Sequence, residues 1–112
     1  MVGCKHYMAP EILTEQAYDP KGDIWAATCV VYCLLIGKMP FKGDNWEEIK
    51  ESINKTDWDR EFKQAHWSHI SSKAKNFIKK GFEIDLNKRF SAQKMLNHQW
   101  LKDVGETIQA PI

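Results

Sequence analysis

The sequence of 112 residues is long enough for one domain with a hydrophobic core and too short for two large lobes. Hydrophobic residues make up 43% of it and aromatic residues 12%, which is typical of a globular rather than a disordered protein. The 16 basic and 15 acidic residues give a formal net charge of +1, which argues against nucleic-acid or electrostatic membrane binding, since both need a surface of one sign.

Three features favour an intracellular protein. The three cysteines follow no spacing of a disulfide framework, as is usual in a reducing compartment. No apolar segment follows the first six residues, so a secretory signal is not expected. The longest uncharged run, residues 24–36, is shorter than the ~18 to 20 residues that a membrane span needs. We expect a cytoplasmic protein with no membrane partner and no nucleic-acid partner.

Residues 1–18 have no sustained hydrophobic period, and we expect a loop with a short helical turn there. Asp19 can cap a helix and Pro20 is tolerated in a first turn, so a helix is predicted to begin at this point. The uncharged run follows without alternation, which predicts a helix buried on nearly every side. Gly37 fits the end of this helix.

A second helix is predicted after residue 44. Asp44 and Glu47 have the spacing of a capping box, with Asp44 as the N-cap. Trp46, Ile49 and Ile53 then share one face of a short amphipathic helix.

The polar stretch 54–69 is interpreted as a loop held down by large rings at Trp58, Phe62 and Trp67. Two further helices follow. Ser71 or Ser72 can cap the first of these. Its expected apolar face is Ala74, Phe77, Ile78 and Phe82.

Ser91 is expected to cap the last helix, and the tail from Asp103 is expected to be frayed. Four main helices without a convincing strand predict an all-α fold. The apolar side of the last helix is Ala92, Met95, Leu96 and Trp100.

Five short motifs lie along the chain. They are Tyr7-Met8-Ala9-Pro10-Glu11, Asp23-Ile24-Trp25, Gly37-Lys38-Met39-Pro40-Phe41, residues 85–92 and His98-Gln99-Trp100-Leu101. In this order they resemble the lower half of the large lobe of a eukaryotic protein kinase, from the end of the activation segment onward. Residues 34–41 and 74–78 look most like the calcium/calmodulin-dependent and calcium-dependent serine/threonine kinases. The resemblance implies an incomplete kinase domain over residues 1–102 and a tail over 103–112.

The resemblance implies a structural site around the Ala9-Pro10-Glu11 motif. In the family this glutamate pairs with the arginine that corresponds to Arg89. A planar guanidinium can hold a carboxylate through two parallel hydrogen bonds, so a buried pair would join the activation segment to the lobe. The alternative is that both residues are exposed surface charges.

Asp23 and Trp25 belong to the motif that begins the family's central helix. In the family this aspartate accepts hydrogen bonds from the backbone of the catalytic loop. From the residues alone, Asp23 is equally a first-turn acid favoured by the helix dipole. The loop that would face the substrate corresponds to Gly3, Cys4, Tyr7 and Met8.

The motifs that carry out phosphoryl transfer are missing from the sequence. Transfer needs a glycine-rich loop, a strand lysine, a His-Arg-Asp loop and an Asp-Phe-Gly segment for magnesium. None of these occurs here. We therefore expect no catalytic residue, no metal site and no ATP or magnesium binding by this chain, although the intact family uses both.

Several residues depart from the family pattern inside the matching region. Cys4 stands where the family has a threonine, Ala26 where it has a serine and Thr28 where it has a glycine. Leu86 and Gln99 each stand where the family has a proline, and Gly81-Phe82 stands where a pair like Leu-Leu is expected. A glycine inside a helix weakens it by about 1 kcal/mol. The departures fit relaxed constraint, as in a partial gene copy or a pseudokinase.

Two functions are compatible with the sequence. The first is a fragment of a serine/threonine protein kinase, whose partners are a protein substrate or an upstream kinase half. The second is a non-catalytic remnant that acts as an interaction module, through its apolar helix and a groove near Trp46. Because the apolar helix needs neighbours on every side, we expect the isolated chain to be marginally stable and to expose an apolar patch.

Overall fold

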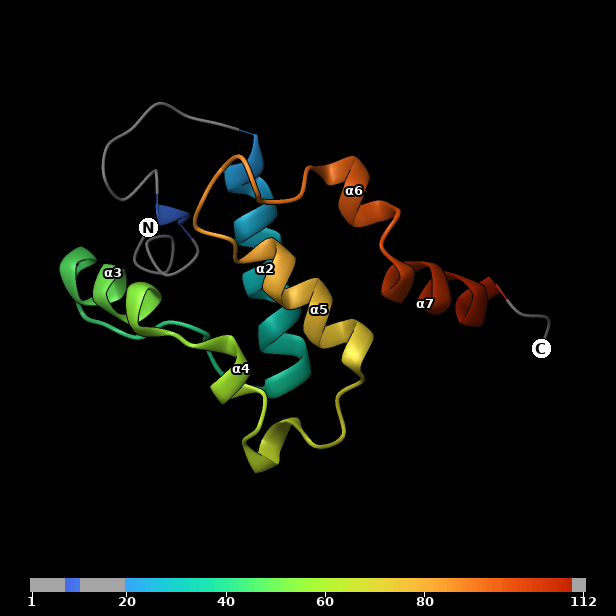
Figure 1. Cartoon of the computed structure of the whole chain (residues 1–112), viewed down its shortest axis with the longest axis horizontal. Helices are drawn as coiled ribbons and strands as arrows, with labels where there is room; N and C mark the ends of the chain where they lie inside the picture. Colours follow the sequence, from blue (N-terminus) through green and yellow to red (C-terminus); the bar gives the residue numbers. More distant parts are fainter. Residues whose placement is uncertain (1–7, 11–19, 110–112) are drawn as a thin grey trace.

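The computed structural model describes residues 8–10 and 20–109, and in this part of the chain it contains helices but no strand. The all-α prediction is therefore confirmed, although the described residues form six α-helices rather than four main ones. Figure 1 shows their arrangement along the chain. They are α2 (Lys21–Ile36), α3 (Trp46–Lys55), α4 (Trp58–Glu61), α5 (Ser72–Gly81), α6 (Ala92–Leu96) and α7 (Gln99–Gln109), with the 3₁₀ helix η2 (Ala65–Trp67).

Helix α2 is the longest helix and has the limits that the sequence predicts. It begins directly after Pro20, while the proposed cap Asp19 lies outside the described residues. It ends at Gly37, whose φ of 85° is left-handed and whose N–H donates to the carbonyl oxygen of Cys33 at 2.8 Å. Glycine adopts this conformation without strain, which explains why the helix stops there.

Helix α5 packs against α2 (Figure 1), and Gly81 of α5 lies close to Thr28 of α2. A Cβ atom added to Gly81 would clash with Oγ1 of Thr28. The buried hydroxyl of Thr28 donates to the carbonyl oxygen of Ile24 at 2.7 Å, so it is satisfied within its own helix. The glycine in α5 therefore has a packing role that the sequence reading, which saw only a weakened helix, missed.

The core between α2 and the following segments is built of aromatic rings. Trp67 is fully buried, and its ring centroid lies 4.8 Å from that of Phe62 and 5.5 Å from that of Tyr32. Trp58 stacks on Phe82 at 5.4 Å. The prediction that three large rings hold residues 54–69 against the core is confirmed.

The prediction that residues 54–69 form only a loop is wrong. Asp57 accepts hydrogen bonds from the backbone N–H groups of Asp59 and Arg60, and α4 begins there. Trp67 ends the short helix η2 and donates from Nε1 to Oε2 of Glu61 at 3.1 Å. Both helices are too short to leave a hydrophobic period in the sequence.

The cap of α3 lies one residue later than predicted. Asn45, not Asp44, is the N-cap, and its Oδ1 accepts the N–H of Glu48 at 2.9 Å. The Glu48 carboxylate accepts the backbone N–H of Asp44 at 2.6 Å. Two backbone N–H groups at the start of α3 are therefore paired by the reciprocal contacts of a capping box. Glu48 takes the place that the sequence predicts for Glu47.

The predicted apolar face of α3 is confirmed at two of its three positions. Ile49 and Ile53 are buried in the core. Trp46, in contrast, is 43% exposed and lines a shallow hollow with Asn45, Glu47 and Lys50. The large ring at the start of α3 therefore lies on the surface.

The caps predicted for the last two helical segments are confirmed. Ser71 accepts the N–H of Ala74 at 3.1 Å at the start of α5, and Ser91 accepts the N–H of Lys94 at 3.3 Å at the start of α6. The apolar face predicted for α5 is buried throughout.

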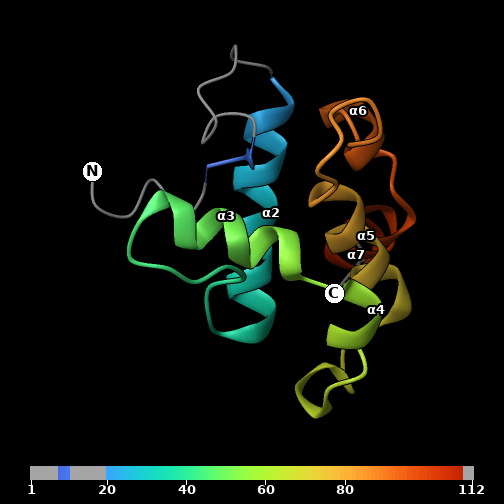
Figure 2. The ribbon, with the colours of Figure 1, turned by 60° about the vertical axis from the view of Figure 1, so that its left-hand side comes forward.

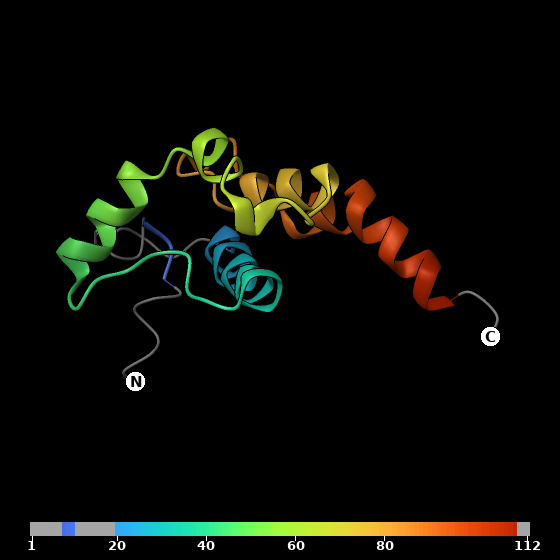
Figure 3. The ribbon, with the colours of Figure 1, turned by 90° about the horizontal axis from the view of Figure 1, so that it is seen from below.

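The single last helix of the prediction is in fact two helices, α6 and α7. The chain turns at Asn97, and Nδ1 of His98 accepts the N–H of Trp100 at 3.1 Å, which starts a new helix. As a result Met95 is buried while its neighbour Leu96 is 69% exposed. The tail predicted from Asp103 is helical as far as Gln109, where α7 ends, and its fraying stays a prediction. Figures 1 and 3 show α7 projecting from the far end of α5, away from α3.

Candidate functional site

Arg89 lies in the connector between α5 and α6 and is only 1% exposed. Its Nε donates to the carbonyl oxygen of Glu83 at 2.8 Å, and its Nη1 donates to the carbonyl oxygen of Lys21 at 3.0 Å. The guanidinium also lies 4.9 Å from the ring centre of Trp25. One buried cation therefore joins the connector to the first turn of α2, which is far away in the sequence.

A second contact runs in parallel between the same two segments. Nζ of Lys21 donates to the carbonyl oxygen of Leu86 at 2.8 Å. The connector 83–90 is thus held to the start of α2 by hydrogen bonds in both directions. The acceptor at Leu86 is its backbone carbonyl oxygen, which every amino acid has. The replacement of the family's proline by leucine therefore leaves this acceptor in place.

The described part of the Ala-Pro-Glu motif contributes to the hydrophobic core. Ala9 is fully buried in the same hydrophobic cluster as Trp25, and Met8 packs against that cluster. The Trp25 ring stacks on Phe41 at 5.4 Å, from the loop after α2. Residues from three separate motifs therefore belong to one hydrophobic cluster, which contains Trp25.

The predicted Glu11–Arg89 pair falls partly outside the described residues. The buried position of Arg89 is what such a pair requires, and it argues against an exposed surface charge at residue 89. The pair itself stays a prediction, as does the substrate-facing role of Gly3, Cys4 and Tyr7, which also lie outside the described part. Met8, the remaining residue of that loop, is half-buried.

Asp23 lies in the first turn of α2 and is exposed. Its backbone N–H donates to the carbonyl oxygen of Pro20 at 3.1 Å. An acid here interacts favourably with the N-terminal end of the helix dipole, as the residues alone predict. The catalytic loop that this residue holds in the family has no counterpart in the sequence.

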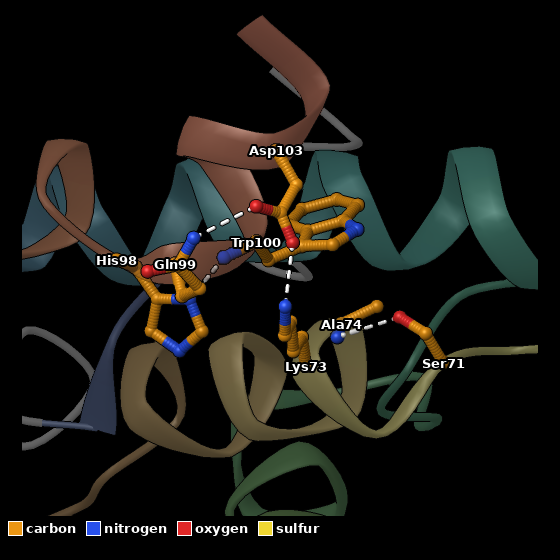
Figure 4. Close-up of polar contacts among 7 residues, drawn as sticks. All are labelled: Ser71, Lys73, Ala74, His98, Gln99, Trp100 and Asp103. Carbon is orange, nitrogen blue, oxygen red and sulfur yellow. Dashed lines mark hydrogen bonds and ion pairs between the residues drawn. The ribbon is translucent and has the colours of Figure 1, made fainter. Parts of the chain in front are cut away.

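A polar cluster between α5 and α7, drawn in Figure 4, was missed by the sequence analysis. The Asp103 carboxylate accepts hydrogen bonds from Nζ of Lys73 and from Nε2 of Gln99, both at 2.7 Å. Nε2 of His98 lies 2.8 Å from Oδ1 of Asn76, so the ring donates there and accepts at Nδ1. The i,i+4 spacing of Gln99 and Asp103 is the only part of this cluster that the sequence could have indicated.

Two members of the cluster have a lowered pKa. The hydrogen bonds from Lys73 and Gln99 lower the pKa of Asp103 below its ordinary value. Partial burial, with a smaller effect of the nearby Lys80 charge, lowers the pKa of His98. A neutral His98 keeps Nδ1 available as an acceptor, so both groups hold α7 on α5 rather than supply catalytic chemistry.

The side chains present do not fit ATP or magnesium. No group of three or more His, Cys, Asp or Glu residues in the described ranges is arranged to hold a metal ion. The whole sequence also lacks the lysine, asparagine and aspartate motifs that hold ATP and magnesium in kinases. The two described cysteines, Cys29 and Cys33, form no disulfide, and burial raises the pKa of both thiols, which makes them poor nucleophiles.

Comparisons with known proteins identify relatives of this chain. A family model described as the protein kinase domain matches residues 1–101. Myosin light chain kinase A from Dictyostelium discoideum is 42% identical over 100 residues, which are 89% of this chain and 33% of that protein. Calcium-dependent protein kinase 2 from Oryza sativa subsp. japonica is 38% identical, and calcium-dependent protein kinase 25 from Arabidopsis thaliana is 36% identical, each over all of this chain and 21% of the relative.

The chain belongs to the protein kinase family. It carries part of a kinase domain similar to those of serine/threonine kinases, and it spans a third or less of the length of these relatives. None of the helices in the described ranges is both long and apolar enough to cross a membrane.

Proposed function

We propose that this chain is the lower part of the large lobe of a serine/threonine protein kinase, and that it acts in the ATP-dependent phosphorylation of proteins only together with an upstream part. The observation that carries the proposal is the buried Arg89, which bonds to the start of α2 and contacts Trp25, a member of the same hydrophobic cluster as Ala9. This is the arrangement needed to dock the end of an activation segment on the lobe.

Within this function, each predicted site residue has a role. Glu11 would complete the Arg89 site through a buried ion pair, and the loop of Gly3, Cys4, Tyr7 and Met8 would face the protein substrate. The family relationship supports protein substrates, as does the absence of a basic stripe, which disfavours nucleic acid. We also propose a cytoplasmic location, which the cysteine pattern supports.

A chimaera tests the proposal directly. The preceding kinase residues of myosin light chain kinase A would be joined to this chain and tested for transfer of labelled phosphate to a serine peptide. We expect transfer by the chimaera and none by the 112-residue chain alone. The Arg89→Ala chimaera should lose activity, and the chimaera with Arg60→Ala, an exposed arginine of α4, should keep it.

A second candidate function is a non-catalytic remnant that binds another polypeptide. The observation in its favour is the exposed apolar side of α2, where Val30 is 50% exposed and Leu34 is 80% exposed. The coding sequence upstream of Met1 separates the two functions. In-frame His-Arg-Asp and Asp-Phe-Gly codons would favour the kinase, and a folded but inactive chimaera would favour the remnant.

A further inference from the structure

Three sulfur-containing side chains lie together near the C-terminal end of α2. The Sγ atom of Cys33 lies 3.4 Å from the Sδ atom of Met39, which belongs to the loop after the helix. Figure 2 shows this loop turning back beside the end of α2 before the chain reaches α3. Cys29 lies one helical turn before Cys33, close enough for a charge on Cys33 to raise the pKa of Cys29. We call Cys29, Cys33 and Met39 the sulfur cluster.

The sulfur cluster has an outer and an inner end. Cys33 and Met39 are half-buried, and α2 ends close to them at the exposed Gly37. Cys29, in contrast, is fully buried and lies at the inner end. An ion from solution therefore meets Cys33 and Met39 first and Cys29 last.

The side chains of the sulfur cluster are ligands for a soft metal ion. Thiolate and thioether sulfurs favour Cu(I), whereas Mg²⁺ and Ca²⁺ prefer oxygen ligands. Zinc usually takes four ligands from Cys, His, Asp and Glu, and no group of even three such residues in the described ranges is arranged to hold a metal. The carbonyl groups at the C-terminal end of α2 also favour a nearby positive charge.

We propose that the sulfur cluster binds one Cu(I) ion, with Cys33 and Met39 as the first two ligands and Cys29 as the third. Each cysteine binds the metal as a thiolate, so the bound ion replaces one proton on each thiol, while the thioether of Met39 stays neutral. Neither described cysteine is used in a disulfide, so both are available for this exchange. The sequence predicts no metal site here, because the contact between Cys33 and Met39 depends on how the loop turns back.

Titration of the 112-residue chain with Cu(I), without oxygen and against a chelator of known affinity, tests the site. We expect one copper ion per chain and an X-ray absorption spectrum of the bound copper that shows only sulfur ligands. Met39→Leu removes the thioether but keeps the size and apolar character of the side chain, so it should weaken binding with little effect on folding. Met95→Leu, at a buried methionine of α6, is the matched control and should bind as the wild type does.

Cysteine variants distinguish the sulfur cluster from a single thiol that binds copper by itself. Cys33→Ser should abolish the binding, and Cys29→Ala should weaken it. Cys4→Ser, which removes the cysteine outside the described residues, should leave the affinity unchanged. Equal losses in Cys4→Ser and Cys33→Ser, or nitrogen and oxygen ligands in the spectrum, would show adventitious binding only and overturn the proposal.

The Met39→Leu variant also keeps the proposal testable if a cysteine variant fails to fold. Circular dichroism shows whether each variant retains its helices. A folded Met39→Leu chain that binds Cu(I) as tightly as the wild type contradicts the site. Copper binding is measured without ATP or substrate, so a negative result leaves the proposed kinase function unaffected.

Discussion

Helix α5 contacts two other helices in two different ways. Against α2 it makes a close, buried contact in which Gly81 leaves room for Thr28, beside the aromatic core. Against α7 it adds exposed polar contacts, from Lys73 to Asp103 and from Asn76 to His98, around the rings of Phe77 and Trp100. Buried packing and surface ion pairs differ strongly in strength, so we expect the two contacts to differ in the same way.

The comparison indicates which part of the chain determines its stability. The α2–α5 contact and the Arg89 site join segments that are far apart in the sequence, so their loss should unfold the whole molecule. Helix α7 lies at the edge and depends on side chains that water can reach, so it should open first.

The largest effect is expected from Arg89→Ala. The change leaves the carbonyl oxygens of Glu83 and Lys21 without this donor and removes the cation from the Trp25 ring. We expect a loss of roughly 3 to 5 kcal/mol in the free energy of unfolding, because two carbonyl oxygens lose a charged donor and a large buried side chain is truncated. Urea denaturation measures it, with the exposed Arg60→Ala as control. Equal small losses in both variants would show that Arg89 acts as a surface charge.

The next largest effect concerns the fit between α2 and α5. Gly81→Ala places a methyl group where Oγ1 of Thr28 lies, and we expect a loss of about 1 to 3 kcal/mol despite the higher helix propensity of alanine. Thr28→Gly removes the obstructing side chain, so Gly81→Ala should cost much less in that background. A double-mutant cycle by thermal or urea unfolding measures the coupling. Additive effects of the two changes would contradict the fit.

A smaller effect is expected at His98, through pH. Because its pKa is lowered in the folded chain from an ordinary value of 6.5, the unfolded chain binds more protons near that pH. Its stabilising contribution is therefore full above pH 6.5 and is lost as the pH falls through the lower folded pKa. The free energy of unfolding of the wild type should fall as the pH is lowered from 6.5 to the folded pKa of His98. His98→Gln should not show this fall. His69→Gln, at an exposed position, should keep it.

The smallest effect is expected from the Lys73–Asp103 ion pair. Both side chains are substantially exposed, at 55% and 41%, so Lys73→Ala should lose little stability, and added salt should remove the difference. Lys79→Ala, which breaks the comparably exposed pair with Asp59, is the matched control. A large, salt-independent loss in Lys73→Ala alone would show that α7 is part of the core.

The sequence predicts the helices whose signals are local. Pro20 and Gly37 limit α2, and Ser71 and Ser91 cap their helices, because each acts on backbone groups within a few residues. The break between α6 and α7 escapes this reading, since it depends on His98, which is held by Asn76 from another helix. A residue whose role depends on a distant partner has no local signal.

The same limit applies to the candidate site. The motifs pair Arg89 with Glu11, which lies outside the described residues, and the structure shows Arg89 buried against Trp25, in whose hydrophobic cluster Ala9 also lies. From the sequence alone, Thr28 and Gly81 are two unrelated departures from the family pattern, and such departures fit relaxed constraint. In the structure they are complementary, with a large residue on α2 facing the smallest residue on α5. Complementary departures favour a chain that still packs one specific fold.

Native-state hydrogen exchange tests the central claim most directly, because it measures the opening free energy of each helix in one experiment. We predict that the amides of α2 and α5 exchange only through unfolding of the whole chain, while those of α7 exchange through a local opening of lower free energy. Equal opening free energies in α5 and α7 would contradict the account.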